Sequence, residues 1–227
     1  MSQEYHLILG SGSPRRKQLL EGIGLNPEIR LKDVPEEFPP HLEKEKIAIY
    51  LSKHKAEAFT DELKENDLLL TADTIVWCDG ELLGKPADRD DAIRMLQKLQ
   101  GRDHQVYTGV SLTTVNKSID FYSQSTVWFR KLNEQEITDY VDHYKPFDKA
   151  GAYGAQDCLP AGMNPCSDEE IQFLIRIRKP YLFEQSLALD HAVAIPIIDR
   201  IAGSYFNVMG LPIIEVWNAI HEFSNQD

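Results

Sequence analysis

Residues 6–20 read HLILGSGSPRRKQLL, a short apolar run followed by two glycines, two serines, a proline and three cations. The apolar run is typical of a strand, and the spacing of the leucines after it is typical of a helix. Pro14 suits a first helical position, and Ser13 before it is a good N-cap. Unpaired amides at a helix start attract anions, and arginine forks fit phosphate oxygens. Arg15 and Arg16 therefore predict a phosphate cradle at this turn.

Two well-known glycine-rich phosphate loops are excluded by the spacing. A dinucleotide-binding fingerprint needs a third glycine where Arg15 stands, and a P-loop needs Gly-Lys-Ser/Thr where this chain has Arg16-Lys17-Gln18. Taken alone, the turn is equally typical of a capped surface helix whose cations are solvated. Both interpretations stay open on this stretch by itself.

The composition of the 227 residues is that of an ordinary globular protein. The chain is 42% hydrophobic and 26% charged, which suits one large domain or two small lobes around one core. A formal net charge of −12 opposes general binding to nucleic acid or to an anionic membrane, although it allows a small basic pocket. No run approaches the roughly eighteen apolar residues of a membrane span, and the N-terminal residues lack the pattern of a signal peptide. We therefore expect a cytoplasmic protein.

The three cysteines are Cys78, Cys158 and Cys166, and they form no Cys-x-x-Cys pair. Their odd number and their spacing fit reduced thiols better than a disulfide framework or a zinc site. We expect them to serve in packing.

Strand and helix patterns alternate along the chain, without an internal repeat or an obvious linker. Amphipathic helices are expected at residues 45–59, after Asp88, after Asn133 and at the C-terminal end, and strands at 68–77, 104–115, 119–132 and 192–198. The pair Asp79-Gly80 is a hairpin signal. This alternation predicts an α/β chain with a mixed sheet.

Three further stretches carry polar groups in unusual places. Asp73 interrupts the apolar run LLLTADTIVW, where an ionised carboxylate is costly unless it is paired, bound to a metal or facing a cleft. Lys85 stands beside a proline after the hairpin, and the loop DKAGAYGAQ mixes glycines with Asp148, Lys149 and Gln156. Each feature also has a plain structural interpretation: an aspartate that holds a loop, a solvated lysine and a simple turn of the chain.

Taken together, five motifs resemble those of the Maf family, in the family's order: S-x-S-P-R-R, A-D-T-x-V, G-K-P, D-K-A-G-A-Y-G-x-Q and G-S-Y-x-N-V-x-G-L-P. The resemblance covers about residues 5–156 and 191–222. Maf proteins are nucleoside triphosphate pyrophosphatases, once described as septum-formation inhibitors. The resemblance implies a two-lobed, ITPase-like α/β fold around an elongated mixed sheet with flanking helices, formed by a single catalytic domain over residues 1–227. It also implies a substrate cleft and, as is common in the family, a homodimer.

Residue by residue, the resemblance implies a triphosphate site. The side chains that would face the phosphates are those of Ser11, Ser13, Arg15, Arg16, Lys55 and Lys85. Asp73 would accept a proton from the water that attacks the α-phosphorus, with Arg16 and Lys85 as the other catalytic side chains. Asp73 and Glu36 would hold Mg²⁺ or Mn²⁺, which oxygen ligands suit.

Base choice in the family follows three positions, occupied here by Arg15, Thr74 and Gln156. All three match the branch that takes dTTP and UTP, and differ from the sibling branch that acts on 7-methyl-GTP. The implied activity is hydrolysis of these nucleotides, and of modified pyrimidine nucleotides, to nucleoside monophosphate and pyrophosphate. A non-catalytic nucleotide-binding regulator of cell division is the alternative. The presence of Asp73, Arg16 and Lys85 argues against it, because a pure binder needs no water-activating carboxylate.

Residues 158–189 depart from the family pattern, in which the G-x-Q motif runs almost directly into the next strand. Within this segment, Ser167 and Glu170 form a capping-box pattern. The apolar positions that follow at helical spacing are Ile171, Leu174 and Ile175. We therefore expect an insertion with a short helix, whose apolar face packs on the body of the protein or on a partner subunit.

Overall fold

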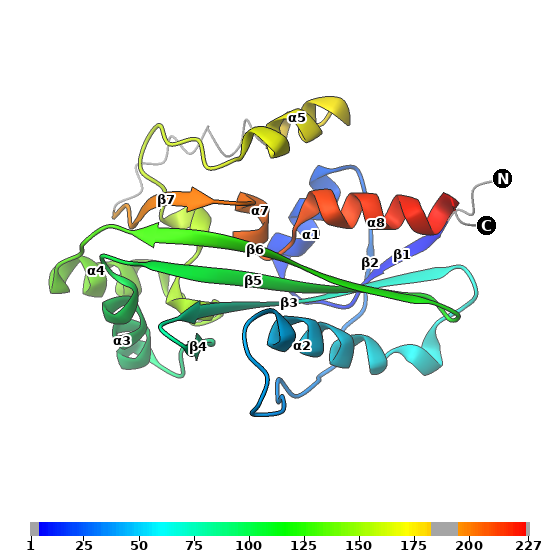
Figure 1. Ribbon diagram of the computed structural model, residues 1–227, viewed down its shortest axis with the longest axis horizontal. Coiled ribbons are helices and arrows are strands. Elements are labelled where there is room, and N and C mark those ends of the chain that lie inside the picture. Colours follow the sequence, from blue (N-terminus) through cyan, green and yellow to red (C-terminus); the bar gives the residue numbers. More distant parts are fainter. Residues whose placement is uncertain (1–4, 183–194, 226–227) are drawn as a thin grey trace.

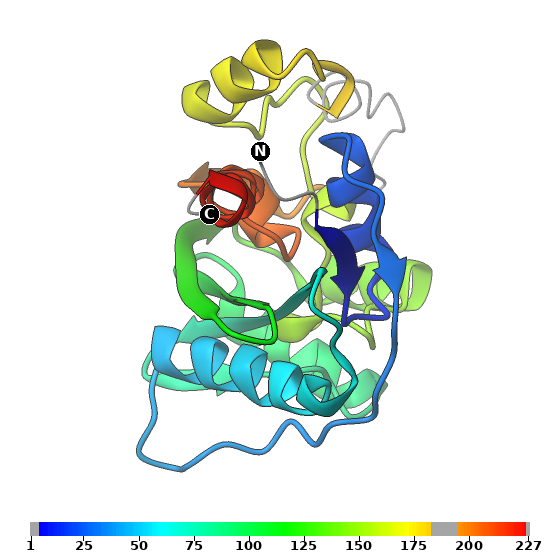
Figure 2. The same cartoon turned by 90° about the vertical axis from the view of Figure 1, so that its right-hand side faces the viewer.

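The computed structural model describes residues 5–182 and 195–225, in which one elongated sheet runs through the molecule with helices on both faces (Figures 1 and 2). The strands are β1 (His6–Leu9), β2 (Glu28–Ile29), β3 (Asp67–Cys78), β4 (Glu81–Leu83), β5 (Asp103–Thr113), β6 (Ser118–Phe129) and β7 (Ile198–Ala202). The helices are α1 (Pro14–Gly22), α2 (Glu45–Glu57), α3 (Arg89–Leu99), α4 (Glu134–Tyr144), α5 (Asp168–Arg176), α7 (Tyr205–Val208) and α8 (Ile213–Asn225).

The sheet is mixed, in the order β2-β1-β3-β5-β6-β7, with β4 paired to β3 outside this path. Strand β1 runs parallel to β2 and β3, and the other pairings are antiparallel. Helix α2 covers one face, while α7 and α8 cover the other (Figure 2). An α/β fold around an elongated mixed sheet with flanking helices is therefore confirmed.

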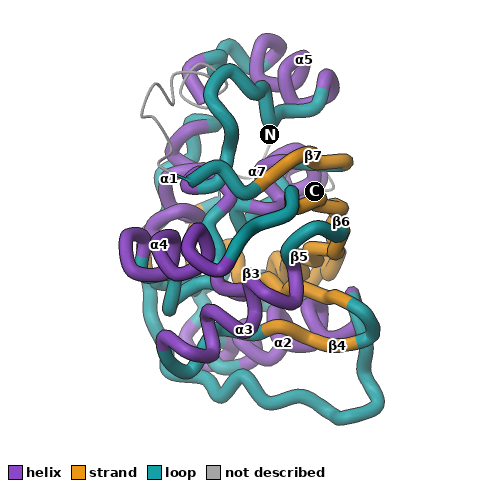
Figure 3. The backbone as a smooth tube through the Cα atoms, turned by 90° about the vertical axis from the view of Figure 1, so that its left-hand side faces the viewer, coloured by secondary structure: helices purple, strands orange, loops and turns teal. Residues whose placement is uncertain are grey.

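Most of the expected helices begin where the local capping signals place them. Ser13 caps α1 by accepting from the backbone N–H of Arg16 at 3.5 Å, and Asp88 caps α3 by accepting from that of Asp91 at 2.8 Å. Asn133 starts α4, which lies beside α3 at one end of the sheet (Figures 1 and 3). These sites are local in sequence, which is why the pattern alone locates them.

The sheet allows α2 to approach closely because Gly109 of β5 has no side chain. A Cβ atom built there would lie 2.3 Å from the backbone carbonyl carbon of Ala48 in α2. Any larger residue at this position would push the helix away from the sheet. Gly109 is also paired with Asp73 in the β3–β5 register, so the close approach brings α2 against the stretch that carries this carboxylate.

The strand expected at residues 192–198 is wrong for residues 195–197, which lie outside any strand. Residues 192–194 lie outside the described part of the chain, and β7 begins only at Ile198. The backbone N–H groups of Ile197 and Ile198 donate to the carbonyl oxygen of Cys158 at 2.9 and 3.0 Å, and Pro196 has no N–H to offer a sheet. The carbonyl oxygen of Ile197 accepts from the N–H of Arg130 at 3.0 Å, and the regular pairing with β6 starts at the next residue, where Ile198 pairs with Phe129.

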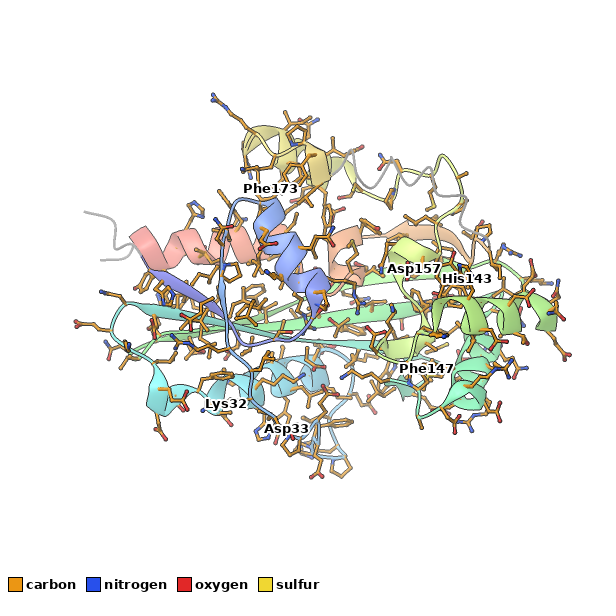
Figure 4. All side chains as sticks on the ribbon, turned by 180° about the vertical axis from the view of Figure 1, so that it is seen from behind. Lys32, Asp33, His143, Phe147, Asp157 and Phe173 are labelled. Atoms are coloured by element: carbon orange, nitrogen blue, oxygen red, sulfur yellow. The ribbon has the colours of Figure 1, made fainter. Side chains whose placement is uncertain are left out.

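Helix α5 confirms the helix expected in residues 158–189, including its capping box. Two of the three expected apolar positions pack on the main core, Leu174 fully and Ile171 partly, whereas Ile175 is 55% exposed and Phe173 is buried instead. Phe173, labelled in Figure 4, makes an edge-to-face contact with Trp217 of α8, with ring centroids 6.0 Å apart. The helix therefore packs on the body of the protein.

The three cysteines are all buried, and none of them forms a disulfide among the described residues, as expected for thiols that serve in packing. Among the helices of residues 5–182 and 195–225, none has the length and apolar character of a membrane span.

Candidate active site

A cleft of about 600 Å³ lies where the turn before α1, the loop after β2, α2, β3, the loop after β4 and residues 148–156 meet. All the residues expected to form the site line it, namely Ser11, Ser13, Arg15, Arg16, Glu36, Lys55, Asp73, Thr74, Lys85 and Gln156. Lys32 and Asp33, on the loop after β2 (Figure 4), also belong to its wall. The fold thus gathers into one cleft residues that are far apart in the sequence.

The cleft is basic although the chain is acidic. Its cationic side chains are Arg15, Arg16, Lys32, Lys55, Lys85 and Lys149, and its acidic side chains are Asp33, Glu36, Asp73 and Asp148. The excess of cations contrasts with the net charge of −12 for the whole chain. A concave, locally positive surface of this kind concentrates anions.

Arg16 lines the cleft and is held by hydrogen bonds from all three of its side-chain nitrogens. Nε donates to the carbonyl oxygen of Gly210 at 2.9 Å, Nη1 to Ser11 Oγ at 3.1 Å and Nη2 to Thr74 Oγ1 at 3.1 Å. Thr74 Oγ1 also lies 2.9 Å from Thr108 Oγ1 on the neighbouring strand. The guanidinium is therefore pre-oriented, with remaining N–H groups on both Nη atoms.

Lys55 connects two carboxylates that line the cleft, Glu36 and Asp73. Its ammonium contacts Glu36 Oε1 at 3.0 Å and forms an ion pair with Asp73. Lys85 contacts Glu36 as well, at 3.0 Å from Oε1 and 3.1 Å from Oε2. Burial raises the pKa of Glu36, but the two lysines outweigh this effect and the net shift is downward. Glu36 therefore stays ionised and orients both ammonium groups.

Asp73 is the most deeply buried carboxylate of the cleft, with 7% of the residue exposed. Burial raises its pKa above the ordinary value of 3.8, and the charges of Lys55 and Arg16 oppose the rise. A carboxyl group with a raised pKa in a cleft is a stronger base than a solvated one, which is what proton abstraction requires.

The other end of the cleft carries Gln156 and the loop around it. Arg15 Nη1 contacts Asp148 Oδ2 at 3.4 Å, and Lys149 Nζ contacts Asp148 Oδ1 at 2.8 Å. The side-chain N–H of Gln156 donates to Asp157 Oδ2 at 3.4 Å, while no donor among the described residues reaches its buried Oε1. Burial raises the pKa of Asp157, against the opposing charges of Lys149 and Arg15. An unpaired buried acceptor is costly, and a ligand with an N–H group would satisfy it.

The carboxylates fit a metal ion only together with other ligands. In the described part of the chain, no three His, Cys, Asp or Glu side chains gather closely enough to hold a metal by themselves. Glu36 and Asp73 face the same ammonium group, so their oxygens point into one region of the cleft. Two carboxylates plus phosphate oxygens and water are the usual ligands of Mg²⁺ at nucleotide sites.

The sequence does not assign every cleft residue to the site. Asp148 and Lys149 belong to the motif D-K-A-G-A-Y-G-x-Q, in which the resemblance implies a role only for Gln156, and Lys32 stands in a loop without any motif. Gly210 belongs to the G-S-Y-x-N-V-x-G-L-P motif, yet it acts through its carbonyl oxygen, which no residue type reveals. A backbone acceptor can be recognised only once the path of the chain is known.

The fold and the cleft thus define an α/β protein with a cation-rich, anion-attracting site around a buried carboxylate. The family model described as Maf-like protein matches residues 6–162 and 160–223. The chain therefore belongs to the Maf family.

Similar proteins from several bacteria carry one name. A dTTP/UTP pyrophosphatase of Bacteroides thetaiotaomicron is 40% identical over 218 residues, which cover 96% of this chain and 95% of that protein. A dTTP/UTP pyrophosphatase of Porphyromonas gingivalis is 36% identical over 228 residues, covering 99% and 98% of the two chains. The solved structure of the Staphylococcus aureus Ham1 protein aligns with 79% of this chain and 98% of that chain, at a TM-score of 0.39 and 15% identity.

Proposed function

We propose that this chain hydrolyses dTTP and UTP to the nucleoside monophosphate and pyrophosphate. The observation that carries the proposal is the cluster of Arg16, Lys55 and Lys85 around one buried carboxylate, Asp73, and its partner Glu36. A triphosphate needs several cations to offset its charge, and its hydrolysis needs one base to activate water. The names of the relatives support the same reaction.

In this mechanism Asp73 takes a proton from a water molecule whose oxygen attacks the α-phosphorus. The new bond forms between that oxygen and the α-phosphorus, the bond to the bridging oxygen breaks, and pyrophosphate leaves with the electron pair. Arg16 and Lys85 stabilise the charge that develops on the phosphate oxygens. Ser11, Ser13 and Arg15, at the start of α1, also face the triphosphate in this proposal.

Lys55 links substrate binding to the basicity of Asp73. Its ammonium lowers the pKa of Asp73 in the free protein. A phosphate oxygen that enters the cleft competes for this ammonium, and a carboxylate that loses a cationic partner becomes more basic. Binding of the triphosphate thus prepares the base for its reaction.

The cofactor in this proposal is Mg²⁺ or Mn²⁺, held by Asp73 and Glu36 together with phosphate oxygens. The metal supplies positive charge that polarises the phosphoryl oxygens. Glu36 also keeps Lys55 and Lys85 directed into the cleft, through contacts of 3.0 Å.

Base selection in this proposal rests on Gln156, with Arg15 and Thr74. The amide presents an acceptor, Oε1, without a partner among the described residues, and a donor, Nε2. This pair matches the N3–H and O4 groups shared by thymine and uracil, whereas cytosine reverses both groups. Pyrimidines with an intact N3–H and O4 edge, including modified ones, therefore fit better than cytosine.

We further propose a single catalytic domain over residues 1–227, in which residues 158–189 are an insertion, and a cytoplasmic protein that forms a homodimer. The net charge of −12 supports the absence of nucleic-acid and membrane partners.

One experiment separates this enzyme from a non-catalytic nucleotide-binding regulator. Purified protein is mixed with dTTP and Mg²⁺ in water enriched in ¹⁸O, and the products are quantified. We expect equal amounts of dTMP and pyrophosphate, with the label in dTMP because water attacks the α-phosphorus. Binding without turnover would favour the regulator, and release of inorganic phosphate would contradict the proposed reaction.

A further inference from the structure

Glu170 is a buried carboxylate in the first turn of α5, with 1% of the residue exposed. It accepts hydrogen bonds from its own helix start, where the backbone N–H of Ser167 lies 2.9 Å from Oε2. It also accepts from Ser204 Oγ at 2.6 Å, from the N–H of Tyr205 at 3.2 Å and from that of Phe206 at 3.1 Å. One carboxylate therefore caps two helices, α5 and α7.

Helix α7 runs from this cap to the cleft. Asn207 is fully buried, and its amide donates to Val106 O at 3.2 Å and to Ser125 Oγ at 2.9 Å. Two residues after α7 ends at Val208, the chain reaches Gly210, whose carbonyl oxygen accepts from Arg16 Nε.

The turn at Gly210 has a conformation that favours glycine, with φ of 110°. This conformation turns the carbonyl oxygen toward the guanidinium of Arg16. Thr108 Oγ1 donates to the carbonyl oxygen of Asn207 at 3.1 Å and contacts Thr74, the other partner of Arg16. The position of α7 is thus coupled to two of the three groups that orient Arg16.

We infer that Glu170 is a positioning residue for the triphosphate site, which holds the start of α7 and thereby places the Gly210 carbonyl that orients Arg16. This inference rests on the proposed pyrophosphatase function. An amide at position 170 has only one acceptor oxygen, so its NH₂ group faces backbone N–H donors in either orientation. The start of α7 then shifts to relieve the conflict, and Arg16 loses its alignment.

The inference is tested with a double-mutant cycle of Glu170→Gln and Arg16→Ala, measured as kcat/KM for dTTP. Misplacement of a catalytic group by about 1 Å costs up to about 100-fold, so we expect Glu170→Gln to lower kcat/KM by about 10- to 100-fold. In the Arg16→Ala background the same change should cost less than about twofold, because residues that act through one another are not additive. Equal losses in both backgrounds, or no loss at all, would overturn the inference.

The ratio of kcat/KM for dTTP over dCTP is a second readout. Because Glu170 acts on the phosphate end, this ratio should stay unchanged in Glu170→Gln. If Glu170→Gln instead disturbs the whole cleft, the ratio should change. That result would mean that Glu170 contributes only to the stability of the fold.

A matched control is Glu136→Gln. Glu136 occupies the same capping-box position of α4 and accepts from the N–H of Asn133 at 2.9 Å and from Arg130 at 2.8 Å. It does not line the cleft. We expect kcat/KM within about twofold of wild type, so a larger loss would mean that any weakened helix cap reduces activity.

Two provisions keep the inference falsifiable. If Glu170→Gln does not fold, Ser204→Ala takes its place in the cycle, because it keeps the carboxylate but removes both the 2.6 Å hydrogen bond to Glu170 and the 2.9 Å hydrogen bond by which Ser204 caps α7 at Asn207. If wild type does not release pyrophosphate from dTTP, the proposed function fails, and the same cycle is measured as calorimetric binding of tripolyphosphate in EDTA. Additive effects on that binding, or its absence in wild type, would overturn the inference independently.

Discussion

The Nε atom of Arg16 donates to the carbonyl oxygen of Gly210 at 2.9 Å, across a sequence separation of 194 residues. The first and the last motif of the chain therefore meet at one guanidinium, whose other arms contact Ser11 and Thr74. Burial lowers the pKa of the Arg16 guanidinium, while the charge of Asp73 opposes the change. The cation and the proposed base are thus part of one electrostatic unit, and changes at either should be felt by the other.

Replacing the proposed base is the first test of the mechanism. Asp73→Asn should lower kcat by ~100- to 10,000-fold while the protein stays folded, because an amide does not accept the proton. Pyrophosphate release and thermal unfolding measure the two effects. The control is Asp120→Asn. Asp120 lies on β6, outside the cleft, and forms an ion pair of 3.0 Å with Lys53 of α2. An Asp73→Asn protein with half the wild-type rate would refute the assignment.

The pH profile should report the environment of Asp73. Its pKa is raised above 3.8 by burial, and the base must be ionised to act. Activity should therefore fall as the pH is lowered through this raised pKa, and the acidic limb of kcat/KM should lie above pH 3.8.

Lys55→Met should move this acidic limb to higher pH. The ammonium of Lys55 lowers the pKa of Asp73, so its removal leaves the burial effect less opposed. Lys53→Met, on the same helix but outside the cleft, should leave the limb in place. A limb that stays put or moves down in Lys55→Met would contradict the proposed coupling.

The Mg²⁺ concentration that the activity requires should depend on Glu36. EDTA should abolish pyrophosphate release, and Mg²⁺ or Mn²⁺ should restore it. Glu36→Gln should raise the Mg²⁺ concentration for half activity by about tenfold or more, the scale of losses from perturbed metal surroundings. The neighbouring Glu37 is exposed and does not line the cleft, so Glu37→Gln serves as the control. A shift in Glu37→Gln instead would move the proposed ligand by one position.

Base selectivity should depend on the amide of Gln156. Each buried polar group left unpaired costs ~1 to 3 kcal/mol, and two mismatches with cytosine give a preference on the order of 100-fold for UTP over CTP. ATP should be a weak substrate because a purine is larger.

In Gln156→Glu the preference for UTP should largely vanish, because a carboxylate does not donate to O4. Steady-state kinetics on dTTP, UTP, dCTP, CTP and ATP measure it. Gln135→Glu is the matched control, since Gln135 bonds to Asp139 on α4 and lies outside the cleft. Comparable kcat/KM for CTP and UTP in wild type would rule out the proposed recognition of the base edge by Gln156.

The packing of α5 on the body can be tested by two neighbouring residues. Leu174 is fully buried, and Leu174→Ala should lower the free energy of unfolding by ~2 to 5 kcal/mol. Ile175 is 55% exposed, and Ile175→Ala should change it by less than about 0.5 kcal/mol. Denaturant unfolding measures both. Equal effects would mean that α5 does not pack on the core as described.

Much of the fold follows from short-range signals in the sequence. Asp79-Gly80 marks the hairpin before β4, and both residues adopt positive φ, 51° and 81°. Asn133 and Ser167 mark the starts of α4 and α5, because a cap and its partner lie within one helical turn. The position of β7 could not be predicted in this way, since it depends on hydrogen bonds from Ile198 to Cys158, 40 residues away in the chain.

For the candidate site too, the sequence predicts some features and the tertiary structure determines others. The types and order of its residues are enough to identify the family and to single out Asp73, Arg16 and Lys85. The contact partners of these side chains cannot be predicted from the sequence in the same way. That Lys55 lies between two carboxylates, or that Glu170 caps a helix leading to Arg16, depends on contacts between segments far apart in the chain. Residue type determines which bonds a side chain can form, and only the path of the folded backbone decides which of them it does form.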